Sequence, residues 1–196
     1  MEYPNWFAMY ADRFFVRYLS PLAGTPGLRF LQIGAFTGDA SVWMLENILT
    51  GDDCALIDVD TWQGSDEGIH RTFDWEDVRS IYCHKVEKFR DGRLYDHVGT
   101  SEGFFESESL YGVHGCAFDF VYIDGSHDSY DVLNDAVNAY RVLKVGGLLA
   151  FDDYNWQTGH GAARDPKTAI DAFAEIYGDR LELLTAGPQA WFRRVA

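Results

Sequence analysis

The sequence predicts an α/β fold with a doubly wound, mostly parallel sheet, and three observations support this prediction. Four short apolar runs have the composition of buried strands, and they span residues 29–33, 54–59, 118–123 and 148–151. Between the last two runs, apolar side chains recur at helical spacing, namely at Leu133, Ala136, Val137 and Tyr140. A strand, a crossover helix and a strand of this length form one parallel βαβ unit.

The composition limits both the size of the fold and the class of partner. The 196 residues, 47% of them hydrophobic, suit a single globular domain over residues 1–196. Acids outnumber bases by 31 to 16, which gives a formal net charge of −15. So acidic a surface argues against nucleic acid and against anionic membranes as partners, because both attract basic patches. The chain has no apolar run of about 18 residues, so we expect no transmembrane helix.

The cysteines and the remaining segments complete this picture. Cys54, Cys83 and Cys116 include no C-x-x-C pair, which favours reduced thiols and a cytoplasmic location. Residues 6–19 carry an apolar stripe at helical spacing, which predicts a helix. This helix is expected to pack on the domain; alternatively it also covers a pocket or contacts the second subunit of a homodimer. Further elements are expected in chain order: a helix at 42–49, one at 78–90, a strand at 96–100, helices at 102–111 and 166–177, and an antiparallel hairpin at 181–185 and 190–195.

A glycine-containing turn joins the first strand to its helix. Gly34 allows a sharp turn and a close approach of a ligand, and Gly38 stands where the helix begins, with free N–H groups and a positive dipole end. Asp58 follows Gly38 by 20 residues, where an acid can accept hydrogen bonds from both ribose hydroxyls. Trp62, just past that strand, stacks on a ligand or covers the sheet edge. The turn lacks G-x-G-x-x-G, which disfavours a nicotinamide or flavin dinucleotide.

Three carboxylates follow the strands of the predicted βαβ unit. Asp124 ends one strand, and Asp152 and Asp153 end the next, after a helix that Gly146-Gly147 is expected to stop. Neighbouring parallel strands bring their carboxyl ends to one edge of the sheet, where open α/β sheets bind ligands. Carboxylates so close repel each other unless a cation or an oxygen-rich ligand joins them. The glycine-containing loop at 155–164 is a candidate gate over this crevice.

Three segments, FLQIGAFTGDAS, LIDVDTWQG and FDFVYIDGSH…LKVGGLLAFDDY, occur in this order between Phe30 and Tyr154. Together they resemble the class I S-adenosylmethionine-dependent methyltransferases, in particular the small metal-dependent O-methyltransferases of macrolide sugars and, more distantly, the catechol-type enzymes. The resemblance implies a Rossmann-like sheet of seven strands in the order 3-2-1-4-5-7-6, with an antiparallel C-terminal hairpin. It also implies a set of cofactor-binding residues, which are Gln32, Gly34, Ala35, Phe36, Gly38, Ser41, Asp58, Val59, Trp62, Ser101 and Asp124.

The same resemblance implies metal and catalytic roles. Asp124, Asp152 and Asp153 match the divalent-metal ligands, and oxygen ligands favour Mg²⁺, with Mn²⁺ or Ca²⁺ as alternatives. His127 falls where the catechol-type enzymes keep a lysine as base, and imidazole titrates near neutral pH. His127 is therefore the first candidate base and Asp124 the second. The chain departs from the family pattern at Gln32, where an acid is usual.

We therefore expect an enzyme that transfers a methyl group from S-adenosylmethionine to a hydroxyl of a small molecule, sugar or glycan, with divalent-metal assistance. Two alternatives stay open. Asp58-Val59-Asp60 has the Asp-x-Asp spacing of metal-dependent glycosyltransferases, and a protein that binds the cofactor without catalysis would tolerate Gln32. A nucleic-acid methyltransferase is disfavoured, because the chain is acidic and its Asp152-Asp153-Tyr154 lacks the prolines of the Asn/Asp-Pro-Pro-Tyr motif.

Overall fold

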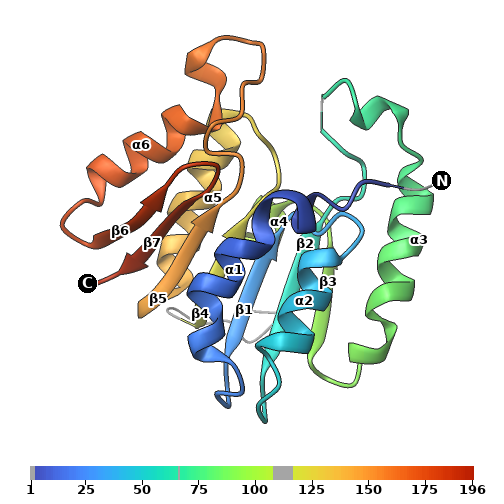
Figure 1. The fold of residues 1–196 in the computed structure, drawn as a ribbon. Coiled ribbons are helices and arrows are strands. Elements are labelled where there is room, and N and C mark those ends of the chain that lie inside the picture. The colour runs from blue at the N-terminus through green and yellow to red at the C-terminus, as the bar shows by residue number, and fades with distance from the viewer. Residues whose placement is uncertain (1–2, 66, 108–116) are drawn as a thin grey trace. The chain divides into compact units, whose positions relative to one another are not determined.

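The computed structural model describes residues 3–65, 67–107 and 117–196 (Figure 1). The chain divides into two compact units, Met1–Val98 and Gly99–Ala196, each of which is described by itself. Numbered along the chain, the seven strands follow the order β3-β2-β1-β4-β5-β7-β6. The strand order and the fold class expected from the sequence are therefore confirmed, whereas the single domain stays a prediction.

The N-terminal unit is built on three parallel strands, two of which are mostly buried. These strands are β1 (Arg29–Ile33), β2 (Ala55–Asp60) and β3 (Leu94–Val98), with β2 paired to both others. The longer helices of the unit are α1 (Asp12–Leu19), α2 (Asp39–Asn47) and α3 (Trp75–Val86). Shorter helical turns are η1 (Phe7–Ala11), η2 (Ser20–Leu22), η3 (His70–Thr72) and η4 (Glu87–Phe89). Asp74 caps α3, because its side chain accepts the N–H groups of Glu76 and Asp77.

The C-terminal unit joins a parallel strand pair to an antiparallel hairpin. Its strands are β4 (Phe118–Ile123), β5 (Leu143–Phe151), β6 (Leu181–Ala186) and β7 (Ala190–Arg194). Its helices are α4 (Ser101–Glu106), α5 (Ser129–Val142), η6 (Ala162–Arg164) and α6 (Pro166–Ile176). The strand β5 pairs in parallel with β4 and antiparallel with β7. This pairing lets β7 deliver side chains to the end of β5.

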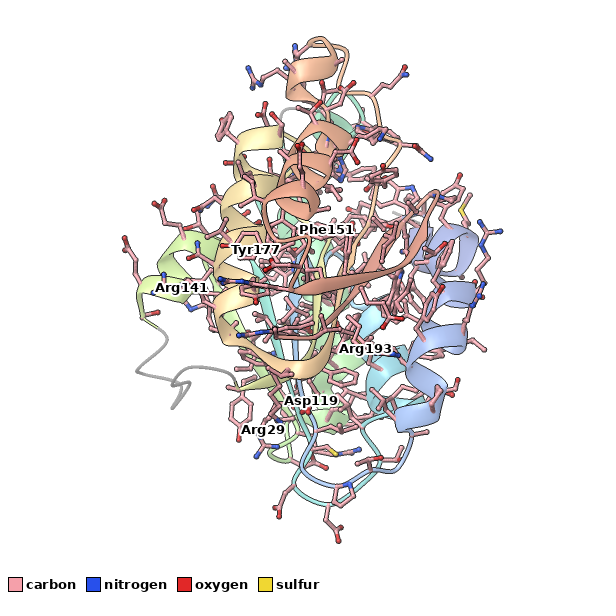
Figure 2. The ribbon with its side chains drawn as sticks, turned by 90° about the vertical axis from the view of Figure 1, so that its left-hand side faces the viewer. Arg29, Asp119, Arg141, Phe151, Tyr177 and Arg193 are labelled. Atoms are coloured by element: carbon pink, nitrogen blue, oxygen red, sulfur yellow. The ribbon has the colours of Figure 1, made fainter. Side chains whose placement is uncertain are left out.

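An aromatic core fills the space beside α6. The ring of Phe173 lies 6.0 Å from that of Phe151 and 4.7 Å from that of Tyr177, centroid to centroid. Figure 2 labels Phe151, the last residue of β5, and Tyr177, which directly follows α6. Within the described ranges, no helix has the length and apolar character needed to cross a membrane.

Some expected boundaries differ from the observed ones. The helix expected to end at Gly146-Gly147 ends instead at Val142, and both glycines lie inside β5. Leu143 is fully buried and pairs with Phe118, so burying this side chain in the sheet starts the strand early. The N-terminal helix begins with the π-helical turn η1, and the helix expected at 102–111 is seen as α4. Residues 108–111 and Cys116 lie outside the described residues.

Gly38 is required where β1 turns into α2, and its substitution yields a first prediction. Its φ is +82°, and a Cβ there would lie 2.9 Å from Cδ2 of Tyr82. Gly27 has a similar φ of +72° with nothing within 4 Å of an added Cβ, so it isolates the backbone effect. We expect Gly27→Ala to lower the free energy of unfolding by about 1–2 kcal/mol, and Gly38→Ala to lower it by about 1–3 kcal/mol more, because of overpacking. Urea denaturation measures both, and equal losses would contradict the role of Tyr82.

Candidate active site

The glycine turn after β1 is clamped by the carboxylate of Asp60. One oxygen, Oδ2, accepts the backbone N–H groups of Ala35 at 2.8 Å and Phe36 at 2.9 Å. The other, Oδ1, accepts the N–H of Trp62 at 2.7 Å. Phe36 and Trp62 both have φ of +48°, a conformation that costs free energy in a non-glycine residue and clusters at functional sites. Asp60 thus holds two strained turns together at the carboxyl end of β2.

Asp58, the predicted ribose ligand, faces the interior instead. Its side chain has no exposed surface, and its Oδ2 accepts a hydrogen bond from the hydroxyl of Tyr82 at 2.9 Å. Burial raises the pKa of Asp58 to about 7, against the lowering effect of hydrogen bonds from Ser41 and Tyr82. Asp60, and not Asp58, is therefore the acid at the end of β2 that lies beside the glycine turn. The buried Asp58 is therefore not accessible to a metal ion from solvent, as a metal-binding Asp-x-Asp pair would require.

Aromatic side chains cover the turn. Trp62 is 4% exposed and its Nε1 donates to the carbonyl of Phe36 at 2.9 Å, so its indole packs on protein rather than projecting into solvent. The ring of Phe36 stacks on Trp6, with 4.8 Å between centroids and 24° between planes. The burial of Trp62 agrees with one of the two roles expected for this residue, namely that it covers the edge of the sheet.

The other predicted residues of the N-terminal unit lie in the turn or on β1, β2 and α2 around it. Gln32 and Ser41 are fully buried, and the carbonyl of Val59 accepts the N–H of Gly34 at 2.8 Å. Ser101, predicted to lie beside adenine, belongs to the C-terminal unit. Burial raises the pKa of Asp135 to about 7, and the side chain of Ser101 opposes this effect.

The acidic cluster lies at the ends of β4 and β5. Ile123 pairs with Phe151, so Asp124 and the Asp152-Asp153 pair follow adjacent strand positions, as the sequence predicted. One ligand atom each from Asp124, His127 and Asp153 lie within 4.8 Å of one another. His127 Nε2 is 2.8 Å from Asp153 Oδ2, and Asp153 has φ of +50°. These side chains line a pocket together with Asp152.

Sequence reasoning missed the residue that holds Asp152. Gln189, fully buried on the turn before β7, donates from Nε2 to Asp152 Oδ1 at 2.6 Å and to the hydroxyl of Tyr122 at 3.4 Å. Its Oε1 accepts the indole N–H of Trp191 at 2.8 Å. Gln189 is thereby fixed at both ends of its amide, and it restrains the carboxylate of Asp152.

Negative charge is concentrated in this pocket. Burial raises the pKa of Asp124 well above its ordinary value, and the charges of Asp152 and Asp153 raise it further while His127 lowers it. Burial, and then the charge of Asp153, raises the pKa of Asp152 to about 6. Repulsion of this kind is relieved by a bound cation, and two carboxylates with an imidazole suit a divalent metal. The donor set therefore fits the predicted metal, although Asp152 stands outside the closest group.

The candidate gate loop is anchored beside this pocket. Arg164 pairs with Asp128 at the start of α5, and the Thr158 hydroxyl donates to Asp165 at 2.8 Å. The ring of Trp156, which is 43% exposed, lies 5.6 Å from that of His127. The loop thus brings one large aromatic side chain next to the predicted base.

The seven strands, with an antiparallel hairpin at one edge of the sheet and acids at the carboxyl ends of β2, β4 and β5, define an α/β protein of the methyltransferase fold. The chain belongs to the methyltransferase domain family, whose model matches residues 31–154. The resemblance seen in the sequence is thereby confirmed at the level of the family.

Individual relatives are more distant. The chain is 28% identical over 97 residues to caffeoyl-CoA O-methyltransferase of Pinus taeda, a match that spans 50% of this chain and only 33% of that protein. The O-methyltransferase TomG from Streptomyces achromogenes, involved in tomaymycin synthesis and solved with SAM, has a TM-score of 0.60 at 16% identity, covering 86% of this chain and 73% of its own. MycE from the mycinamycin biosynthetic pathway, solved with Mg, SAH and mycinamycin VI, has a TM-score of 0.61 at 16% identity, covering 100% of this chain and 50% of its own.

Proposed function

We propose that this protein is an S-adenosylmethionine-dependent O-methyltransferase that acts on a hydroxyl of a small molecule or sugar with the help of a divalent cation. The observation that carries the proposal is the group formed by Asp124, His127 and Asp153, in a chain of the methyltransferase domain family. The structures of TomG with SAM and of MycE with Mg and SAH support the same cofactor and metal. A cytoplasmic location, a glycan acceptor and a homodimer stay predictions.

Each residue of the pocket has a proposed role in this reaction. Asp124 and Asp153 would hold the cation, with Asp152 kept in place by Gln189. When bound, the cation would orient the acceptor hydroxyl and lower its pKa. His127 would take the proton from that hydroxyl at one ring nitrogen, while its contact with Asp153 fixes the orientation of the imidazole. Trp156 would exclude water from the base.

We assign the cofactor to the glycine turn, with Asp60 in the place that the sequence suggested for Asp58. Asp60 is partly exposed at the end of β2 and already orders the turn by three hydrogen bonds. It would accept hydrogen bonds from the ribose as well, because a carboxylate has about four acceptor sites. The backbone of Gly34 and Gly38 would allow the close approach of the cofactor.

Calorimetric titration with S-adenosylhomocysteine tests this assignment. We expect the wild type to bind, and Asp60→Asn to bind about 10- to 100-fold more weakly, because a charged hydrogen-bonding group is lost. Asp52→Asn, at an exposed position with the same change of charge, should bind like the wild type. Absence of binding by the wild type would refute the proposed function. Equal affinities of all three proteins would refute the role of Asp60.

A further inference from the structure

The turn between β6 and β7 is bound to the segment that follows β5. The carbonyl of Pro188 accepts the N–H of Tyr154 at 3.0 Å, and the carbonyl of Gly187 accepts the side-chain amide of Asn155 at 2.7 Å. Tyr154 and Asn155 come directly after the Asp152-Asp153 pair. The hairpin therefore anchors the chain at the point where it leaves the acidic cluster.

Gln189 adds a side-chain contact from the same turn. Its Nε2 donates to Oδ1 of Asp152 at 2.6 Å, and its Oε1 accepts the indole N–H of Trp191 at 2.8 Å. Gln189 and Trp191 are fully buried, and the indole stacks on the ring of Phe120 with 5.3 Å between centroids and 11° between planes. A reversed amide would place Oε1 against the carboxylate and its N–H groups against the indole donor. These contacts therefore fix which end of the amide faces Asp152.

The contact with Gln189 determines how Asp152 can bind a cation. Asp152 lines the pocket, and because its Oδ1 is held by the amide, a cation would bind this carboxylate through Oδ2 alone. Oδ2 of Asp153 is likewise engaged, at 2.8 Å from Nε2 of His127. Neither carboxylate is thus arranged to chelate a cation with both of its oxygens.

Single-oxygen ligands of this kind suit a small cation. Mg²⁺ demands nearly ideal octahedral geometry at about 2.0–2.1 Å and keeps several waters, whereas Ca²⁺ takes about 6–8 oxygen ligands at about 2.3–2.6 Å, in part from carboxylates that bind through both oxygens. Gln189 carries no net charge, so its amide restrains Asp152 without competing with the cation for the negative charge of the pocket.

We propose that Gln189 is a positioning residue that selects the cation: by holding Oδ1 of Asp152, it makes the pocket prefer Mg²⁺ or Mn²⁺ to Ca²⁺. This inference rests on the proposed function, because it concerns the cation of the same site. Gln189 acts only through Asp152 and does not touch the cation, and Trp191 keeps its amide in place. The β6–β7 hairpin thereby contributes to the specificity of a site whose ligands follow β4 and β5.

Calorimetric titration of the cation-free protein with Mg²⁺, Mn²⁺ and Ca²⁺ tests this inference without cofactor or acceptor. We expect the wild type to bind Mg²⁺ and Mn²⁺ more tightly than Ca²⁺. Gln189→Met removes the amide from a side chain of similar length, so the Mg²⁺ affinity should fall about 10- to 100-fold, as for other residues that orient metal ligands. The Ca²⁺ affinity should fall less, because a carboxylate released from Gln189 can bind the larger ion with both oxygens. Gln63→Met, the same change at an exposed position, should bind all three cations like the wild type.

Trp191→Phe separates positioning from a purely structural effect. It removes the indole N–H but retains an aromatic ring on Phe120, and Nε2 of Gln189 can still donate to Asp152. We expect a lower free energy of unfolding in urea with an unchanged ratio of Mg²⁺ to Ca²⁺ affinity. Gln189→Met leaves the indole N–H buried without its acceptor, which is costly. If that variant does not fold, Gln189→Met combined with Trp191→Phe removes this N–H as well and should show the shifted ratio.

The inference is overturned if the wild type binds Mg²⁺ and Ca²⁺ equally tightly, or if Gln189→Met weakens the binding of all cations by the same factor. A ratio that shifts as far in Trp191→Phe as in Gln189→Met overturns it as well. In each of these cases the cation still binds, so the proposed function stands. A wild type that binds no divalent cation would instead refute the part of the cation in the proposed function, and this inference with it.

Discussion

Asp124→Asn and Asp153→Asn are each expected to abolish cation-dependent methyl transfer, and Asp124→Asn is also expected to make the cation-free protein more stable. Both side chains belong to the closest group of candidate ligands, so each substitution removes a charged donor. The loss of Mg²⁺ or Mn²⁺ affinity, measured by calorimetry, should exceed the about 10- to 100-fold that substitutions outside the ligand shell cause. Turnover should fall with it, because the acceptor hydroxyl would lose its activation.

The expected gain in stability follows from the sign of the electrostatics. The pKa of Asp124 is raised by burial and by the neighbouring carboxylates, so its ionised form opposes folding at neutral pH. A neutral asparagine removes that penalty, and we expect the thermal midpoint to rise by about 2–4 °C for each kcal/mol recovered. Asp179→Asn is the matched control, because that side chain is 87% exposed and stands apart from the cluster. A lower midpoint together with unchanged cation affinity would contradict the proposed site.

Much of this site consists of residues that directly follow the ends of strands. The sequence predicts it because the pattern of apolar residues shows where those strands end. The expected bounds of β1 and β4 agree with the observed ones, and the acids that follow β4 and β5 come together as parallel pairing requires. His127 could be placed because it lies three residues after Asp124 on the same connection. Local patterns thus locate residues whose position depends on one strand and the turn that follows it.

The parts that sequence reasoning missed depend on packing between distant segments. Asp58 and Asp60 are both aspartates and lie two positions apart on β2. Only the fold reveals that Tyr82 of α3 covers Asp58 and donates a hydrogen bond to it. Gln189 lies 37 residues from Asp152, and the antiparallel register of β7 against β5 is needed to bring the two together. A residue of this kind has no local signature, because its role is defined by its partner.

The role of His127 separates two interpretations of the pocket, and a large effect on turnover is expected here. The imidazole lies among the candidate metal ligands, and it also faces Asp153 at 2.8 Å, an arrangement that suits a base oriented by a carboxylate. If His127 is the base, His127→Ala should lower turnover by about 10²- to 10⁴-fold, the usual contribution of a positioned proton acceptor. Affinity for Mg²⁺ and for S-adenosylhomocysteine should stay close to that of the wild type.

Added imidazole distinguishes a missing base from a damaged fold. With a catechol and a methyl hexoside as probe acceptors, imidazole in the buffer should restore part of the turnover of His127→Ala, because it can occupy the vacated space and accept the proton. It should have no such effect on Asp153→Asn, which lacks a charged donor rather than a base. Were His127 a metal ligand, the variant would lose Mg²⁺ affinity as Asp153→Asn does, and higher Mg²⁺ concentrations would restore its turnover. That pattern would assign His127 to the metal and return the role of base to Asp124, the second candidate.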